Sequence, residues 1–145
     1  MCRYEGDNFV LDQQVVRAAL KAFDALAVRK TRTANDLTPS TSYLRHLLSP
    51  PPPSSQWDDP QMAITLLEQR AALMVRERAL HLREPDASMD QRVSRAVTDA
   101  FVAAQVGEIV RALEADVGQQ NAVVLRKLYN LVRVPSHCAP CAVLV

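Results

Sequence analysis

The chain has 145 residues, of which 48% are hydrophobic and 23% are charged, with a formal net charge of +1 and only 3 glycines. This composition is typical of a helical globular domain, and the even spread of 17 basic and 16 acidic residues excludes an electrostatic footprint for nucleic acid or an anionic membrane. No segment approaches the about 18 consecutive apolar residues of a membrane span, and 3 cysteines do not make a disulfide framework, so we expect a reducing compartment.

The first predicted element is a helix over residues 8–29. Asp7 is its expected N-cap, because a carboxylate at that position accepts from an otherwise unpaired N–H of the first turn. The polar segment that follows ends in Thr38-Pro39 and predicts a loop, and "TSYLRHLL" (residues 41–48) predicts two short helical turns. The apolar residues of the first helix recur at helical spacing: Val10, Leu11, Val15, Ala18, Ala19, Ala22, Phe23 and Leu26.

A proline-rich stretch, "SPPPPSS" (residues 49–55), separates this part from the rest of the chain. Successive prolines lack backbone donors and favour an extended conformation, so we expect a loop between packed helices. Asp59 followed by Pro60 is typical of a helix start, and the next helix is predicted over residues 60–83. Its predicted core side consists of Met62, Leu66, Leu73, Met74 and Leu80.

Ser88 and Gln91 stand in the relation of a capping box and predict a third long helix over residues 89–116. Gly118 marks the expected boundary before a fourth helix at residues 119–132. The predicted fold class is therefore all-α, a helical bundle of three or four long helices with a Pro-rich loop. The inner stripe expected for the third helix is Val93, Ala96, Val97, Ala100, Ala104, Val106, Ile109, Val110 and Leu113.

The stretch "YEGDN" (residues 4–8), followed by "VLDQQVVRAALKAF", resembles the segment that begins the second half of peroxisomal acyl-CoA oxidases. In that family the motif precedes a helix with a Gln and an Arg, and this chain has Gln13 or Gln14 and Arg17 there. Further segments are similar in the same order: "TSYLRHL", "LLEQRAALMVRERALHL", "RAVTDAFVAAQVGEIVRAL" and "VVLRKLYNL". The resemblance covers residues 1–131, which we expect to form the C-terminal α-helical region of such an enzyme, with residues 132–145 as a divergent unstructured tail.

The resemblance implies a FAD-dependent oxidation of fatty acyl-CoA. Glu5 would be the general base that removes the α-proton while the β-hydrogen leaves as hydride to FAD. Reduction of oxygen to hydrogen peroxide and release of trans-2-enoyl-CoA complete the first step of peroxisomal fatty acid β-oxidation. A glutamate becomes a sufficient base when the bound acyl chain removes water and hydrogen bonds to the thioester carbonyl stabilise the enolate. Gly6, Asp7 and Asn8 would lie near FAD, whereas Phe9 departs from the small polar residue often found there.

The resemblance also implies a homodimer and a peroxisomal location. In the family, further domains precede the motif and hold most of the FAD, so we expect a truncated product or gene model that releases no peroxide on its own. The C-terminus, Val143-Leu144-Val145, is not an address of the Ser-Lys-Leu type, which keeps the cytoplasm as the alternative compartment.

Two other functions stay open from the residues. One is a non-catalytic helical interaction or dimerisation module, whose proline-rich loop would bind a proline-recognising partner. The other is a redox or zinc centre at Cys138-Ala139-Pro140-Cys141, although that motif lacks both a βαβ setting and enough further ligands, so no metal is predicted. Of the remaining single residues, His46 and His81 are expected on the surface and Trp57 against the bundle. Arg70 is either a buried ion-pair partner or a solvated residue.

Overall fold

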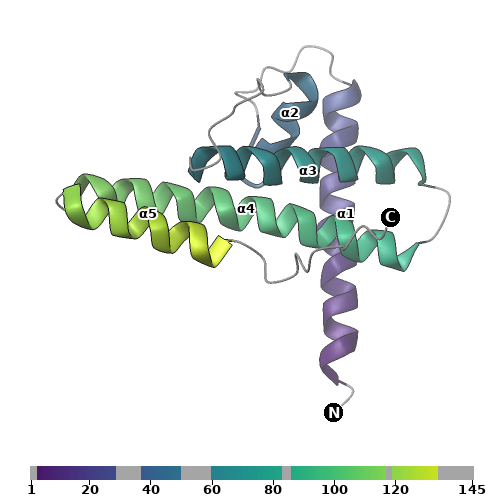
Figure 1. Cartoon of the computed structure of the whole chain (residues 1–145). Coiled ribbons are helices and arrows are strands. Elements are labelled where there is room, and N and C mark those ends of the chain that lie inside the picture. Colours follow the sequence, from purple (N-terminus) through teal and green to yellow (C-terminus); the bar gives the residue numbers. More distant parts are fainter. Residues whose placement is uncertain (1–2, 29–36, 50–59, 83–85, 117–118, 134–145) are drawn as a thin grey trace, which may run out of the picture. The chain divides into compact units, whose positions relative to one another are not determined.

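The computed structural model describes residues 3–28, 37–49, 60–82, 86–116 and 119–133, and this part of the chain contains helices and no strand (Figure 1). The all-α prediction is confirmed, with four long helices at nearly the predicted places. In chain order the elements are α1 (Arg3–Val28), the short 3₁₀ helix η2 (Ser42–Leu44), α2 (Arg45–Leu48), α3 (Pro60–Leu80), α4 (Ala87–Asp116) and α5 (Gln119–Arg133).

Two predicted helix caps are wrong. Helix α1 begins at Arg3, so Asp7 lies inside the helix and is not its N-cap. Gly6 does not stop the helix, because one glycine in a helix costs only about 0.5–1 kcal/mol relative to alanine. Helix α4 begins at Ala87, and its cap is Asp86, whose Oδ1 accepts from the Met89 N–H at 3.0 Å, in place of the predicted Ser88 capping box. Helix α3 does begin at Pro60, as the preference for proline at the first helical position predicts.

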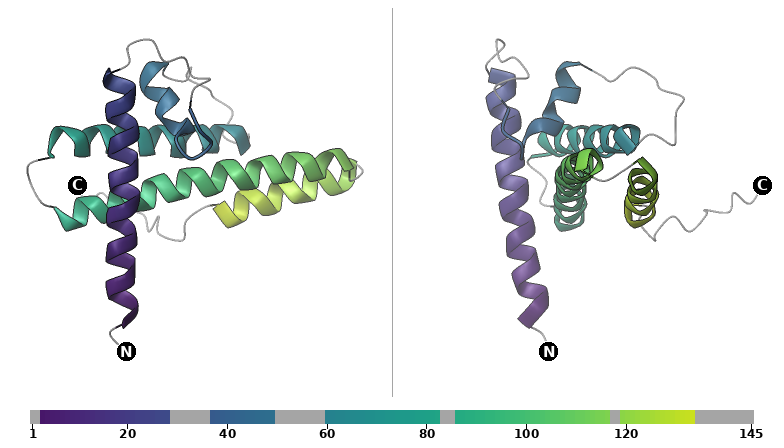
Figure 2. Two further views of the ribbon diagram at one scale, coloured as in Figure 1. Left: turned by 180° about the vertical axis from the view of Figure 1, so that it is seen from behind. Right: turned by 90° about the vertical axis from the view of Figure 1, so that its left-hand side faces the viewer.

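The chain divides into two compact units, Met1–Ala104 and Gln105–Val145. In the first unit, α1 runs across α3 and the first part of α4, which lie side by side (Figures 1 and 2). Many of the side chains buried between these helices are alanines, which allow the helix backbones to approach closely. The buried core of this unit consists of Val16, Ala19, Leu26, Tyr43, Leu44, Ala71, Ala72, Val75, Val93, Ala96, Val97 and Ala100.

The predicted core side of α3 is wrong in its main members. Leu66, Leu73 and Leu80 are 40%, 41% and 78% exposed. The buried side of the helix instead carries Ile64 and Val75 with two alanines, and two charged residues, Glu68 and Arg78. Large apolar residues were expected inside because helical periodicity normally indicates burial, but here the smaller residues form the close contact.

A buried arginine joins the end of α3 to the first turn of α4. Arg78 Nε donates to Asp90 Oδ1 at 2.6 Å, and Arg78 Nη1 donates to the backbone carbonyl of His81 at 2.7 Å. The second bond satisfies a carbonyl just past the end of α3, a region whose acceptors have no intrahelical partner. Arg78 therefore holds the end of α3 against the start of α4 in the first unit.

The second unit contains the last part of α4, from Gln105, and α5. Tyr129 on α5 is buried, whereas Val123, Val124 and Leu128 of the same helix are about half exposed. On α4 the inner stripe is borne out only for its first half, through Ala100, because Val106, Ile109 and Leu113 are exposed. Among the described helices, none has the length and apolar character needed to cross a membrane.

Candidate functional site

The sequence motif of residues 4–8 lies in the first two turns of α1. The backbone of Glu5, Gly6, Asp7 and Asn8 is helical, and no described glycine has a positive φ. Gly6 therefore contributes the absence of a side chain rather than an unusual backbone conformation. The side chains of these four residues lie outside the described part of the structure, so Glu5 as base and the other three as FAD contacts stay predictions.

The start of α1 gives the backbone of Glu5 a specific property. The first N–H groups of a helix have no intrahelical acceptor, and in a helix that begins at Arg3 they include the N–H of Glu5. Helical periodicity also places position 5 on the same stripe of α1 as Val16 and Ala19, which are buried in the core of the first unit. Position 5 therefore combines a backbone donor that has no acceptor within α1 with the stripe that faces the core further along the helix.

An apolar pocket of about 250 Å³ lies further along α1, against η2 and α4 in the first unit. Val15 and Ala19 of α1, Tyr43 of η2 and Phe101 of α4 are among its lining residues. Val15 is about 15 Å from Glu5 along the helix axis, at 1.5 Å per residue. Burial raises the pKa of Tyr43 to about 12, so its phenol stays neutral at physiological pH. The pocket suits an uncharged, apolar group.

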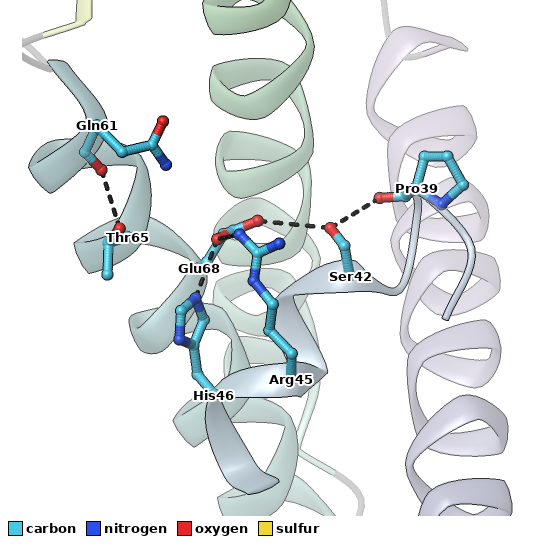
Figure 3. Close-up of polar contacts among 7 residues, drawn as sticks. All are labelled: Pro39, Ser42, Arg45, His46, Gln61, Thr65 and Glu68. Carbon is cyan, nitrogen blue, oxygen red and sulfur yellow. Dashed lines mark hydrogen bonds and ion pairs between the residues drawn. The ribbon is translucent and has the colours of Figure 1, made fainter. Parts of the chain in front are cut away.

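The most organised polar cluster in the described part is centred on Glu68, on the buried side of α3 (Figure 3). Glu68 Oε2 lies 2.5 Å from Arg45 Nη2 and 3.0 Å from His46 Nε2, both on α2. The Ser42 hydroxyl of η2 donates to Glu68 Oε1 at 3.4 Å. Glu68 is only 1% exposed, and a buried carboxylate needs such donors to offset the loss of water. The cluster therefore fastens η2 and α2 to α3.

The cluster contains serine, histidine and a carboxylate, but it does not form a nucleophile–base–carboxylate relay. In such a relay the hydroxyl bonds to the histidine, which is oriented in turn by the carboxylate. Here the single O–H of Ser42 faces two acceptors, the carbonyl of Pro39 at 3.1 Å and Glu68 Oε1 at 3.4 Å, and shares its hydrogen between them. Both Ser42 and His46 thus bind Glu68 (Figure 3). The geometry supports a structural role for Glu68 and does not activate Ser42.

The single residues named from the sequence fall in different places. The surface prediction for His46 is wrong, since its side chain is 8% exposed and bound to Glu68. His81 is exposed, as predicted, and Arg70 is exposed, so it is a solvated residue rather than a buried ion-pair partner. Trp57, the proline stretch at residues 50–53 and the tail with Cys138 and Cys141 lie outside the described residues.

Sequence reasoning missed Glu68 and Arg78. The available signal was their spacing, because both fall on the stripe of α3 that holds Ile64, Ala71 and Val75. A charged residue on a buried stripe is a candidate for an internal ion pair. Within the described residues no group of three or more histidine, cysteine or carboxylate side chains is placed to hold a metal ion.

The fold and the site define an all-α protein with a helical N-terminal motif, an apolar pocket further along the same helix, and a buried glutamate, Glu68, bound by an arginine, a histidine and a serine. No family model, no curated protein and no solved structure matches the chain.

Proposed function

We propose that this chain supplies the catalytic base and the C-terminal helices of a FAD-dependent acyl-CoA oxidase. The observation that carries the proposal is the "YEGDN" motif at residues 4–8, which resembles the catalytic segment of that family. The similar segments further along the chain support it, because they keep the family's order and correspond to η2 with α2, α3, α4 and α5.

The chemistry assigned to the chain's own residues begins with Glu5. Its carboxylate removes the α-proton of the fatty acyl-CoA, and its backbone N–H, which has no acceptor within α1, donates to the thioester carbonyl. That donor stabilises the negative charge that develops on the oxygen. The apolar pocket on the same helix offers a surface to an apolar part of the ligand and excludes water from it.

FAD fits the N-terminal end of α1 in one respect. The first N–H groups of the helix have no acceptor within it, and together with the positive end of the helix dipole they suit a ligand that carries phosphates. Gly6, Asp7 and Asn8 would contribute to holding it. When bound, FAD accepts the β-hydrogen as hydride and passes the electrons to oxygen, giving hydrogen peroxide and trans-2-enoyl-CoA. By the same resemblance the enzyme is a homodimer of the peroxisome.

The test is a chimera in which residues 3–131 replace the corresponding segment of an acyl-CoA oxidase. We expect the chimera to bind FAD and to release peroxide from palmitoyl-CoA. Glu5→Gln should lower kcat about 100-fold or more, the range that general-base catalysis contributes, without loss of flavin absorbance. Glu108→Gln, an exposed glutamate on α4, is the matched control and should leave kcat unchanged. A chimera that binds FAD and keeps full activity with Glu5→Gln would refute the assignment.

The 145-residue chain alone is a second test of the same proposal. In the family, segments that precede the motif hold most of the FAD, so we expect no peroxide from the chain with added FAD. Robust peroxide production that depends on Glu5 would show that the chain holds the flavin without those segments.

A second candidate is a non-catalytic interaction or dimerisation module. The observation that favours it is the number of large apolar side chains left exposed on the long helices, such as Leu11, Leu80 and Ile109. This function predicts that the chain associates with a partner while Glu5→Gln changes neither association nor any oxidase activity of the chimera.

A further inference from the structure

Helix α3 carries two different stripes along its length. The buried stripe contains Ile64, Glu68, Ala71, Val75 and Arg78, whereas the opposite face, which we call the outer stripe, contains Leu66, Arg70, Leu73, Glu77 and Leu80. All five residues of the outer stripe are exposed. The two charged residues of α3 that form ion pairs, Glu68 and Arg78, thus lie on its buried face, and three of its leucines lie on its exposed face.

The outer stripe has the spacing of a helix–helix seam. Its members follow one another at intervals of four, three, four and three residues, which is the heptad pattern of helices that pack along their length. The leucines occupy one of the two seam positions, and a single arginine and a single glutamate occupy the other. Leu66, Leu73 and Leu80 are 40%, 41% and 78% exposed, so they form a row of apolar surface in water.

The two charges in the seam are unpaired in the described part of the structure. Neither Arg70 nor Glu77 makes an ion pair or a side-chain hydrogen bond with a described residue, although Glu68, Arg78 and Asp90 nearby are all engaged. Arg70 and Glu77 are seven residues apart and lie on the same face of the helix. They are therefore available to a partner that approaches this face.

We propose that the outer stripe of α3 pairs with the same stripe of a second copy of this chain, with the two helices antiparallel. In this arrangement Arg70 of one copy meets Glu77 of the partner subunit. The two-fold axis repeats that contact and places Leu73 near the centre of the seam. In a parallel pairing in register, each charge would instead meet its own copy and repel it. A parallel pairing shifted by one heptad would match the charges but leave an open end, which gives fibres instead of a closed dimer.

This inference goes beyond the homodimer implied by the family resemblance, because it names the helix, the contacts and the orientation. It also stands apart from the proposed oxidase activity, since its readout is association rather than peroxide. The chemistry of the partner follows from the stripe alone. A row of three leucines interrupted by one positive and one negative charge forms a closed, charge-matched pair with its own copy only when that copy is reversed.

The experiment is sedimentation equilibrium of the full chain over a micromolar concentration range. We expect a monomer–dimer equilibrium. Arg70→Glu and Glu77→Arg should each weaken it about tenfold or more, because each turns two attractive contacts into two repulsive ones. The double variant Arg70→Glu/Glu77→Arg should restore the dissociation constant to within about threefold of wild type. Arg92→Glu, an exposed charge reversal on α4, is the control and should have no such effect.

Apolar variants test the leucine row. Leu73→Ala should weaken association about tenfold or more, whereas Leu128→Ala, at a leucine of α5 that is also exposed, should not. Since all of these side chains are exposed, far-ultraviolet circular dichroism should show the wild-type helical content in each variant. A chain that is monomeric throughout, a folded double variant without rescue, or a dimer indifferent to Leu73→Ala would overturn the proposal.

Cysteine cross-linking tests the orientation in a background where the three native cysteines are serine. A mixture of Leu66→Cys and Leu80→Cys chains should form a disulfide-linked dimer under mild oxidation, because these positions meet across the antiparallel seam. Leu66→Cys alone should not, since its two copies would be about 20 Å apart along the helices and a disulfide requires Cα atoms within about 7 Å. Cross-linking of Leu66→Cys with itself would show a parallel pairing and overturn the proposed arrangement.

Discussion

Replacing Glu68 with glutamine keeps the volume of the side chain and removes its negative charge, so it isolates the electrostatic part of the cluster on α3. The three contacts of Glu68 differ in how far water screens them. The Arg45 side chain is 44% exposed although it lies 2.5 Å from the carboxylate, which limits that ion pair to about 0.2–1 kcal/mol. The His46 side chain is 8% exposed and 3.0 Å away, and a hydrogen bond to a buried charged group contributes about 1.5–3 kcal/mol.

The Ser42 hydroxyl adds little, because 3.4 Å is long for a hydrogen bond between oxygens. From these contributions together, we expect Glu68→Gln to lower the free energy of unfolding by about 2–4 kcal/mol. Urea denaturation followed by far-ultraviolet circular dichroism measures this change. Glu108→Gln, at an exposed glutamate of α4, is the matched control, because substitutions at exposed positions usually change stability by less than about 0.5 kcal/mol.

Two double-mutant cycles then separate the partners. The cycle of Glu68→Gln with His46→Ala should give a coupling energy of about 1.5–3 kcal/mol, and the cycle with Arg45→Ala should give less than about 1 kcal/mol. This order of coupling energies follows from burial and not from distance, since Arg45 lies closer to the Glu68 carboxylate than His46 but is more exposed to water. A coupling for Arg45 that equals or exceeds that for His46 would refute it, as would a Glu68→Gln variant as stable as wild type.

Two further predictions concern Tyr43 and Arg78. Burial raises the pKa of Tyr43 from 10.0 to about 12, so the stability that comes from keeping this phenol neutral is present below pH 10 and lost as the pH rises through 12. Between pH 9 and about pH 11, the free energy of unfolding of wild type should therefore fall by about 1.4 kcal/mol more than that of Tyr43→Phe. Urea unfolding at each pH measures both changes, and equal losses would contradict the raised pKa of Tyr43. Arg78→Lys should cost about 1–3 kcal/mol, because a single ammonium cannot hold both Asp90 and the His81 carbonyl as the guanidinium does. The exposed Arg76→Lys is its control, and a loss as small as that of the control would contradict this role for Arg78.

Helical periodicity was enough to predict the class of fold and the four long helices. Helix α3 starts where Pro60 indicates, and α4 and α5 meet at the predicted break near residue 118. The start of α1 was predicted too late, because a Glu-Gly-Asp-Asn sequence is as typical of a helix cap as of a first turn. Ser88 and Asp86 were both plausible caps of α4, and the choice of Asp86 depends on backbone geometry that the sequence does not encode locally.

Of the two candidate sites, one could be predicted from the sequence and the other could not. The motif around Glu5 could be named from its residues, because a resemblance does not require the fold. The cluster around Glu68 could not, because its members come from η2, α2 and α3, and the number of residues between α2 and α3 gives no register. His46 illustrates the difficulty: a histidine on a short helix is most often a surface residue, and only the contact with α3 makes it a buried partner. Pairing between segments is a tertiary property, so it appears only once α2 lies against α3.

The placement of charges and leucines on α3 gives the helix two separate tasks. A buried charge is costly unless it is paired, so Glu68 and Arg78 confine the inner face to one arrangement, in which Ser42, Arg45 and His46 meet Glu68 and Asp90 meets Arg78. That requirement fixes the rotation of α3 about its axis, and the same rotation directs the leucines outward. A helix turned the other way would bury its leucines but leave two charges without partners, and the desolvation of those charges would outweigh the apolar gain. The polar contacts inside the protein therefore determine which surface α3 presents outside it.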